Sequence, residues 1–146
     1  MTIFTIGFTQ KSASDFFNLI KENKIDLLID IRLNNVSQLA GFAKGKDLEY
    51  FLRVICNCDY VHDDHFAPTK ELLDSYRAKK QSWQQYEVIF AEIMRERRLS
   101  ERFEELYMKH ENICLLCSEP SADRCHRRLV AEYLQKNIDN IKIVHI

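Results

Sequence analysis

The chain has 146 residues, and 21 Lys and Arg against 22 Asp and Glu give it a formal net charge of −1. Hydrophobic residues make up 46% and charged residues 29%, as is typical of one globular domain with its own core. Nearly balanced charges argue against a general attraction to nucleic acid or to anionic lipid. Nucleic acid is kept as a partner only in the alternative interpretation below. The basic run 95–102 interleaves acids with bases, which favours a solvated helix end.

The expected compartment is the cytoplasm. No run of about 18 apolar residues exists, so we expect no membrane segment. The N-terminal residues 1–7 lack the basic start and long apolar stretch of a signal peptide. Five cysteines are an odd number, and cytosolic thiols stay reduced, so we interpret them as free thiols.

The first thirty residues predict a strand, a helix and a second strand. The apolar run 3–6 predicts a buried strand that ends at Gly7. Ser12 is a good helix cap, and apolar side chains then recur at helical spacing as far as residue 23. The run 27–31 predicts the second buried strand. Strand, helix and strand within about thirty residues form a βαβ unit, which implies parallel pairing and a right-handed crossover.

The same alternation continues to the end of the chain. It predicts a single α/β domain over residues 1–146, with a mostly parallel sheet and helices on both faces. The remaining predicted elements are a loop over 34–45, a helix capped by Asp47, a strand over 59–62, helices capped by Thr69, Ser82 and Ser100, a strand over 113–117, a helix carrying Leu129, Val130, Tyr133 and Leu134, and a strand over 141–146.

Polar residues follow several of these strands at their carboxyl ends, where open parallel sheets bind ligands. Gly7 ends the first strand, Asp30 and Arg32 end the second, and Cys117-Ser118-Glu119 ends the fourth. Asp30 and Arg32 are two apart in a strand, so they share one face. They either point into a pocket as functional groups or form a structural ion pair.

The segment 117–128 carries the most chemistry, because it passes from a strand through a polar loop into a helix. The start of a helix offers free backbone N–H groups and a partial positive charge. Arg124, Arg127 and His126 add cationic or hydrogen-bonding groups there. This combination is typical of a site for phosphate, sulfate or carboxylate.

Two cysteines and a glutamate of this segment are candidates for catalysis. Facing a helix start and arginines, the thiol of Cys117 or Cys125 would have a lowered pKa and act as a nucleophile. The alternative is that both are small buried apolar residues. Glu119 is either a general acid or base, or an ion-pair partner of Arg32 or Arg127.

We expect no metal site from the spacing of the candidate ligands. The run 62–65, with two His and two Asp, is better explained as a hydrophilic turn. Structural zinc sites usually pair cysteines with roughly two to four residues between them. Cys56 and Cys58 are too close for that pattern, and Cys117 and Cys125 are too far apart.

Several short motifs in a fixed order carry a resemblance to a known family. They are Thr5-Ile6-Gly7, Asp30-Ile31-Arg32, Gly41-Phe42, the segment 67–72, Cys117-Ser118-Glu119 and Cys125-His126-Arg127. Together they resemble the uncharacterised family called domain of unknown function 488, over about residues 3–146. The resemblance implies a small α/β domain with these motifs around one pocket, and it supplies no reaction. Asn35 stands where the family commonly has proline, which bears on the course of the 33–40 loop.

We therefore expect a hydrolase or group transferase that acts on an anionic, phosphate-bearing or nucleotide-like ligand at the carboxyl edge of the sheet. The alternative is a non-catalytic module that senses such a ligand or associates with nucleic acid. No cofactor is expected, and the oligomeric state is left open. The expected catalytic residues are Glu119, Asp30, Cys117 and Cys125, and the expected ligand-binding residues are Gly7, Arg32, Ser118, Arg124, His126 and Arg127.

Overall fold

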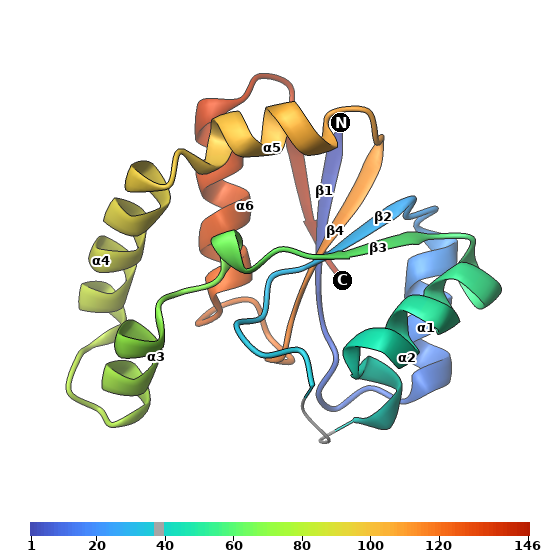
Figure 1. The fold of residues 1–146 in the computed structure, drawn as a ribbon, viewed down its shortest axis with the longest axis horizontal. Helices are drawn as coiled ribbons and strands as arrows, with labels where there is room; N and C mark the ends of the chain where they lie inside the picture. The colour runs from blue at the N-terminus through green and yellow to red at the C-terminus, as the bar shows by residue number, and fades with distance from the viewer. Residues whose placement is uncertain (37–39) are drawn as a thin grey trace.

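Five parallel strands form the centre of the protein in a computed structural model that describes residues 1–36 and 40–146 (Figure 1). They lie in the order β3-β2-β4-β1-β5, and every neighbouring pair is parallel, as predicted. The strands are β1 (Thr2–Gly7), β2 (Leu27–Asp30), β3 (Asp59–His62), β4 (Asn112–Cys117) and β5 (Lys142–His145).

Helices cover both faces of this sheet, which confirms the predicted α/β class (Figure 1). One core lies between the sheet and α3–α6, where Leu27 and Ile29 point, and the other lies on the side of α1 and α2, where Leu28 points. The predicted loop over 34–45 includes residues 37–39, which lie outside the described residues. The helices are α1 (Ala13–Glu22), α2 (Gly45–Phe51), which continues into a π-helical turn (Leu52–Cys56), α3 (Lys70–Arg77), α4 (Trp83–Glu96), α5 (Leu99–Tyr107) and α6 (His126–Asn137).

Three helix starts agree with the capping residues expected from the sequence. Ser12 and Thr69 each accept a hydrogen bond from the backbone N–H three residues further on. Ser82 and Gln85 form a full capping box at the start of α4, with each side chain bonded to the other residue's backbone N–H. These local contacts satisfy N–H groups that a helix start leaves free.

Two predicted caps are wrong. Helix α2 begins at Gly45 and not after Asp47, because the Gly45 N–H is already satisfied by the carbonyl of Asn35 at 2.8 Å. Helix α5 begins one residue before Ser100, after Arg98 in the left-handed conformation with φ of 54°. A short turn between two helices fixes that start, and side-chain capping has no part in it.

The order of the strands differs from the predicted pairing of the first two. β4 lies between β1 and β2, with Cys117 opposite Gly7 and Leu116 opposite Asp30. β4 is the most continuously apolar strand, and a central position buries both of its faces. The chain leaves β1 for α1 on one face and leaves β4 for α6 on the other. Such a divergence opens a crevice at the carboxyl ends of the strands.

The turn after β3 is less solvated than its composition indicates. The Asp63 side chain is 3% exposed and accepts hydrogen bonds from Arg102 Nε at 2.9 Å and Tyr107 Oη at 2.7 Å. The interpretation of 62–65 as a solvated turn is therefore wrong at Asp63, although the neighbouring Asp64 is exposed. Through Asp63, the end of β3 is fixed to α5.

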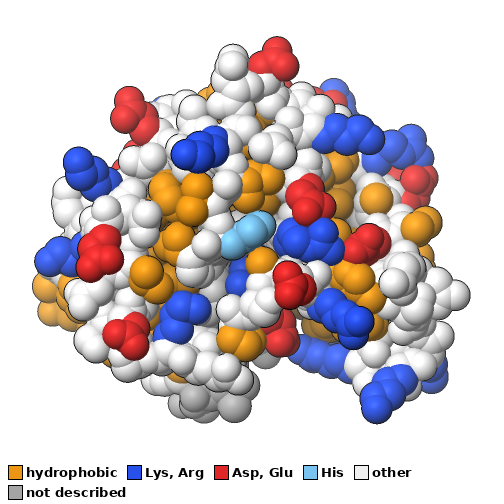
Figure 2. Space-filling view, turned by 180° about the vertical axis from the view of Figure 1, so that it is seen from behind, with side chains coloured by type: hydrophobic (Ala, Val, Ile, Leu, Met, Phe, Trp, Pro, Cys, Tyr) orange, Lys and Arg blue, Asp and Glu red, His pale blue; other side chains and the backbone are white. Residues whose placement is uncertain are grey.

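None of the helices in the described part of the chain combines the length and apolar character needed to cross a bilayer. On the face shown in Figure 2, Lys and Arg side chains are interspersed with Asp and Glu side chains. That distribution agrees with the net charge of −1 and gives this face no broad field of one sign.

Replacing Asp63 with Asn tests the role of this carboxylate. Burial alone would raise the pKa of Asp63, but the hydrogen bonds from Arg102 and Tyr107 outweigh it and lower the pKa. The stabilisation is therefore complete above the unfolded-state pKa of about 3.9, and it disappears as the pH falls through the lower folded-state value. We expect Asp63→Asn to reduce the free energy of unfolding by about 1–3 kcal/mol at neutral pH.

Urea unfolding across a pH series measures this difference, which should shrink in acid. The matched control is Asp64→Asn, which should change stability by less than about 0.5 kcal/mol. Equal losses in the two variants, or a loss that persists unchanged in acid, would contradict the assignment.

Candidate functional site

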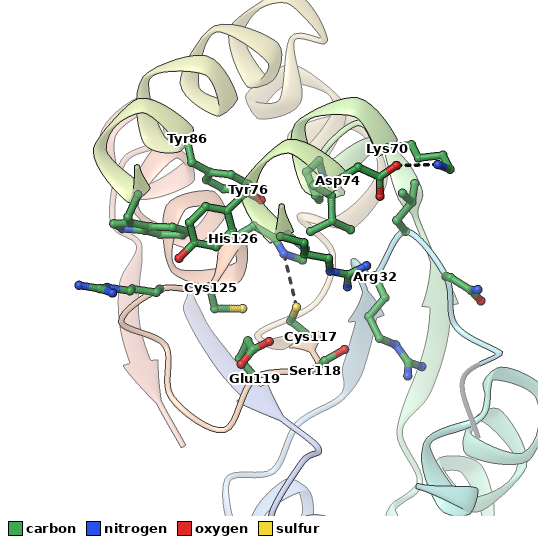
Figure 3. Close-up of a pocket in the computed structure, with 17 residues that line it drawn as sticks. Arg32, Lys70, Asp74, Tyr76, Tyr86, Cys117, Ser118, Glu119, Cys125 and His126 are labelled. Carbon is green, nitrogen blue, oxygen red and sulfur yellow. Dashed lines mark hydrogen bonds and ion pairs between the residues drawn. The ribbon is translucent and has the colours of Figure 1, made fainter. Parts of the chain in front are cut away.

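A cavity of about 430 Å³ opens at the carboxyl ends of the strands (Figure 3). Its walls come from the end of β2, from α3 and α4, and from the segment that joins β4 to α6. Segments far apart in the sequence thus meet around one space. The predicted site residues that line it are Arg32, Cys117, Ser118, Glu119, Arg124, Cys125 and His126.

One corner of the cavity brings two thiols and an imidazole together, and we call Cys117, Cys125 and His126 the Cys–His cluster. The Sγ atom of Cys117 lies 3.4 Å from Nδ1 of His126 (Figure 3). On the other side of the ring, Nε2 of His126 donates to the carbonyl oxygen of Ile31 at 2.8 Å. A carbonyl only accepts, so the Nε2 atom carries the hydrogen and Nδ1 of the neutral ring presents its lone pair to the sulfur.

The two thiols of the cluster have pKa values shifted in opposite directions. A hydrogen bond from the Cys125 thiol lowers the pKa of Cys117; burial opposes the shift, while the N–H groups of Ser118 and Glu119 favour it. The same sulfur–sulfur contact and burial raise the pKa of Cys125. These opposite shifts make Cys117 the more acidic of the two thiols.

The cavity also carries cationic side chains that are not all neutralised. Lys70 is paired with Asp74 at 2.6 Å, and both side chains are exposed (Figure 3). Arg77 and Arg124 form no ion pair with an acid within the described part of the chain. Both of these arginines line the cavity with exposed side chains, and neither has an acidic partner among the described residues.

Arg32 and Asp30 form a buried two-point ion pair, as one of the two sequence interpretations had it. Arg32 Nε and Nη2 donate to the two Asp30 oxygens at 2.8 and 2.6 Å, and Tyr60 Oη donates to Asp30 at 2.8 Å. Burial lowers the pKa of Arg32, but the ion pair with Asp30 outweighs burial, and the net effect is a raised pKa. Arg32 lines the cavity, and its buried Nη1 has no acceptor among the described residues. Asp30 is fully buried and does not line the cavity, so it positions Arg32.

Arg127 and Gly7 lie behind the cavity wall and shape it. Arg127 is 1% exposed and donates to the carbonyl oxygens of Glu119 at 2.5 Å and Pro120 at 3.5 Å. A Cβ atom at Gly7 would lie 1.6 Å from the same Glu119 oxygen. The sequence placed both among the ligand-binding residues, and in the structure both position the loop after β4. Glu119 also has no side-chain ion pair with Arg32 or Arg127 in the described chain.

The opposite wall was not predicted from the sequence. It comes from α3 and α4, where the rings of Trp83 and Tyr86 stack with centroids 4.8 Å apart and Tyr76 packs against both. Tyr86 fits the apolar stripe of α4, so its periodicity indicates only core. Aromatic and cationic residues crowded into the short stretch 76–86 were the one available signal, because only the packing of α3–α4 brings that stretch over the sheet edge.

Adding a methyl group at Gly7 tests how closely the β4–α6 loop approaches β1. Because the Cβ would overlap a backbone oxygen, Gly7→Ala should lower the free energy of unfolding by about 1–3 kcal/mol or more. The control is Gly41→Ala, where a Cβ would meet nothing within 4 Å. Thermal unfolding of the two variants measures the contrast, and a Gly7→Ala protein as stable as the control would contradict the close approach.

Comparisons with known proteins give one match. Residues 12–134 match the family described as Domain of unknown function DUF488. Comparisons with curated proteins and with solved structures found no match. The matched region covers most of the chain and includes the residues that line the cavity, from Arg32 to the Cys–His cluster. The chain therefore belongs to the DUF488 family, as its motifs indicated.

Proposed function

We propose that this protein is a hydrolase or group transferase that acts on a small anionic ligand bound in the cavity. One observation carries the proposal: the Cys–His cluster opens onto the same space as two guanidinium groups that have no acidic partner among the described residues. A reactive corner beside an anion site is what transfer of an anionic group requires. We place this activity in the cytoplasm, where reducing conditions keep the five free thiols reduced.

Arg77 and Arg124 would hold the anion together with the start of α6. The first backbone N–H groups of α6 have no partner within the helix, and the helix dipole favours negative charge there. Guanidinium groups donate two parallel hydrogen bonds to phosphate, which suits a phosphate-bearing ligand. The aromatic wall of Tyr76, Trp83 and Tyr86 supports a nucleotide-like group, since planar rings pack against such side chains.

Cys117 is the centre of the proposed chemistry. As a thiolate it would attack the transferred group: the sulfur–substrate bond forms, the bond to the leaving group breaks, and His126 holds the thiol proton. Alternatively, the cluster would hold a metal ion that activates the ligand or water. In both cases Glu119, which lines the cavity, is the group available to give a proton to the leaving group or take one from water. Asp30 is already engaged with Arg32 and Tyr60.

Substitution of the two cavity arginines, Arg77 and Arg124, tests binding. We expect Arg124→Ala and Arg77→Ala each to weaken binding of pyrophosphate and nucleoside monophosphates by about tenfold or more, because each removes charge-assisted hydrogen bonds. Isothermal titration measures the affinities. The control is Arg95→Ala, which removes the same charge from an exposed position on α4 outside the cavity. Equal weakening in all three variants would mean that only net charge matters, and would contradict the anion site.

Loss of the reacting groups tests catalysis. We expect Cys117→Ser to abolish turnover and Glu119→Gln to reduce it by about 10²–10⁴-fold, while binding of the anion changes little. The control for removal of a thiol is Cys56→Ser, in the π-helical turn remote from the cavity. Turnover of a panel of phosphate esters and nucleotides is the measurement. Binding without any turnover by the parent protein would instead support the non-catalytic binding module.

A further inference from the structure

The three ligand atoms of the Cys–His cluster are already arranged as metal ligands. Sγ of Cys117, Sγ of Cys125 and a ring nitrogen of His126 all lie within 4.8 Å of one another. Tetrahedral zinc, with Zn–S of about 2.3 Å and Zn–N of about 2.0–2.1 Å, places sulfur and nitrogen about 3.5 Å apart and two sulfurs about 3.8 Å apart. The measured separation of the Cys117 sulfur and the His126 nitrogen is 3.4 Å. The cluster therefore needs shifts of about 1 Å or less to enclose an ion.

The orientation of the His126 ring favours the same use. Its Nε2 atom donates to the carbonyl oxygen of Ile31 at 2.8 Å, which fixes the ring and leaves Nδ1 with a free lone pair toward the sulfurs. Histidines that bind metals in proteins almost always make such a hydrogen bond through their second nitrogen, often to a backbone carbonyl. The carbonyl group of Ile31 thus holds the His126 ring in an orientation suited to metal binding.

A second group of candidate ligands lacks these properties. Asp63, Asp64 and His65 also lie close together, but the Asp63 carboxylate already accepts hydrogen bonds from Arg102 and Tyr107. The side chains of Asp64 and His65 are more than half exposed. The comparison singles out the Cys–His cluster, whose three residues are buried and whose ligand atoms face one another.

We propose that Cys117, Cys125 and His126 bind a thiophilic divalent metal ion, zinc before others, with one coordination position open to the cavity. Two thiolates and an imidazole suit zinc and do not suit magnesium or calcium, which prefer oxygen ligands. Three protein ligands with an open fourth position are typical of catalytic zinc, whereas structural zinc is closed by four. All three residues line the cavity, so water or an anionic oxygen of the ligand would take that position.

This inference rests on the proposed function in one respect only, namely the identity of the group that occupies the open coordination position of the metal. If the metal is bound, Cys117 is a ligand and no longer the attacking group, so the metal becomes the reacting centre. Binding of the two thiols releases their protons to solvent and involves no oxidant or reductant.

Cobalt is the probe for the test. The protein is stripped with a chelator under reducing conditions and titrated with Co²⁺, followed by Zn²⁺. We expect one Co²⁺ per chain, with thiolate-to-cobalt charge-transfer absorption and tetrahedral d–d bands that Zn²⁺ abolishes. Cys125→Ser and His126→Gln should weaken binding by at least about tenfold, whereas Cys56→Ser should not. No cobalt spectrum with the parent protein would overturn the inference, and so would an equal effect of Cys56→Ser.

A second measurement needs no substitution, because the cluster variants are buried and could fail to fold. Bound Zn²⁺ should slow alkylation of Cys117 and Cys125 in the parent protein, and should leave Cys56 unaffected, as mapped by peptide mass spectrometry. Equal alkylation with and without Zn²⁺ would overturn the inference.

The two proposals fail separately. Full turnover by the metal-free protein would overturn the metal as the reacting centre and leave the thiolate mechanism. One bound Co²⁺ with no binding of phosphate, pyrophosphate or nucleotides would support the metal site and overturn the proposed function.

Discussion

The buried guanidinium group of Arg127, which has no acidic partner in the part of the chain that the structure describes, determines the geometry at the carboxyl edge of the sheet. Removal of a charge from water is costly unless fixed partners replace the lost hydration. Arg127 obtains those partners from the backbone oxygens of Glu119 and Pro120 and from the hydroxyl of Thr5. The loop after β4 must therefore run where its carbonyls meet the guanidinium, and Gly7 has no side chain in its way. Both the floor of the cavity and the position of Cys117 follow from that constraint.

Arg32, the second buried arginine, replaces its lost hydration with different partners. Arg32 is paired with the Asp30 carboxylate and bonded to the Ala43 carbonyl, so its charge is neutralised inside the protein. Arg127 has no carboxylate partner among the described residues, and its charge lowers the pKa of Cys117. The charge that influences the thiol thus lies behind the cavity wall, whereas Arg77 and Arg124 line the cavity itself.

Much of the fold could be predicted from the sequence, because apolar runs and local caps determine strands and most helix starts. The position of β4 between β1 and β2 could not, since it depends on which strand gains most from burial on both faces. Seven of the ten predicted site residues line the cavity, because strand ends share an edge. Asp30, Gly7 and Arg127 instead position the residues of that edge. The sequence alone does not distinguish a residue that positions the cavity wall from one that lines the cavity. The wall of Tyr76, Trp83 and Tyr86 depends on tertiary packing of α3–α4.

The two sides of the cavity come from separate stretches of chain. The corner with the thiols and imidazole is built by residues 117–126, while the aromatic and cationic wall is built by residues 70–86. Substitutions in the second stretch can therefore change the shape of the cavity without disturbing the Cys–His cluster. With this layout, one wall of the cavity can diverge in sequence over a short stretch while the opposite corner stays constant.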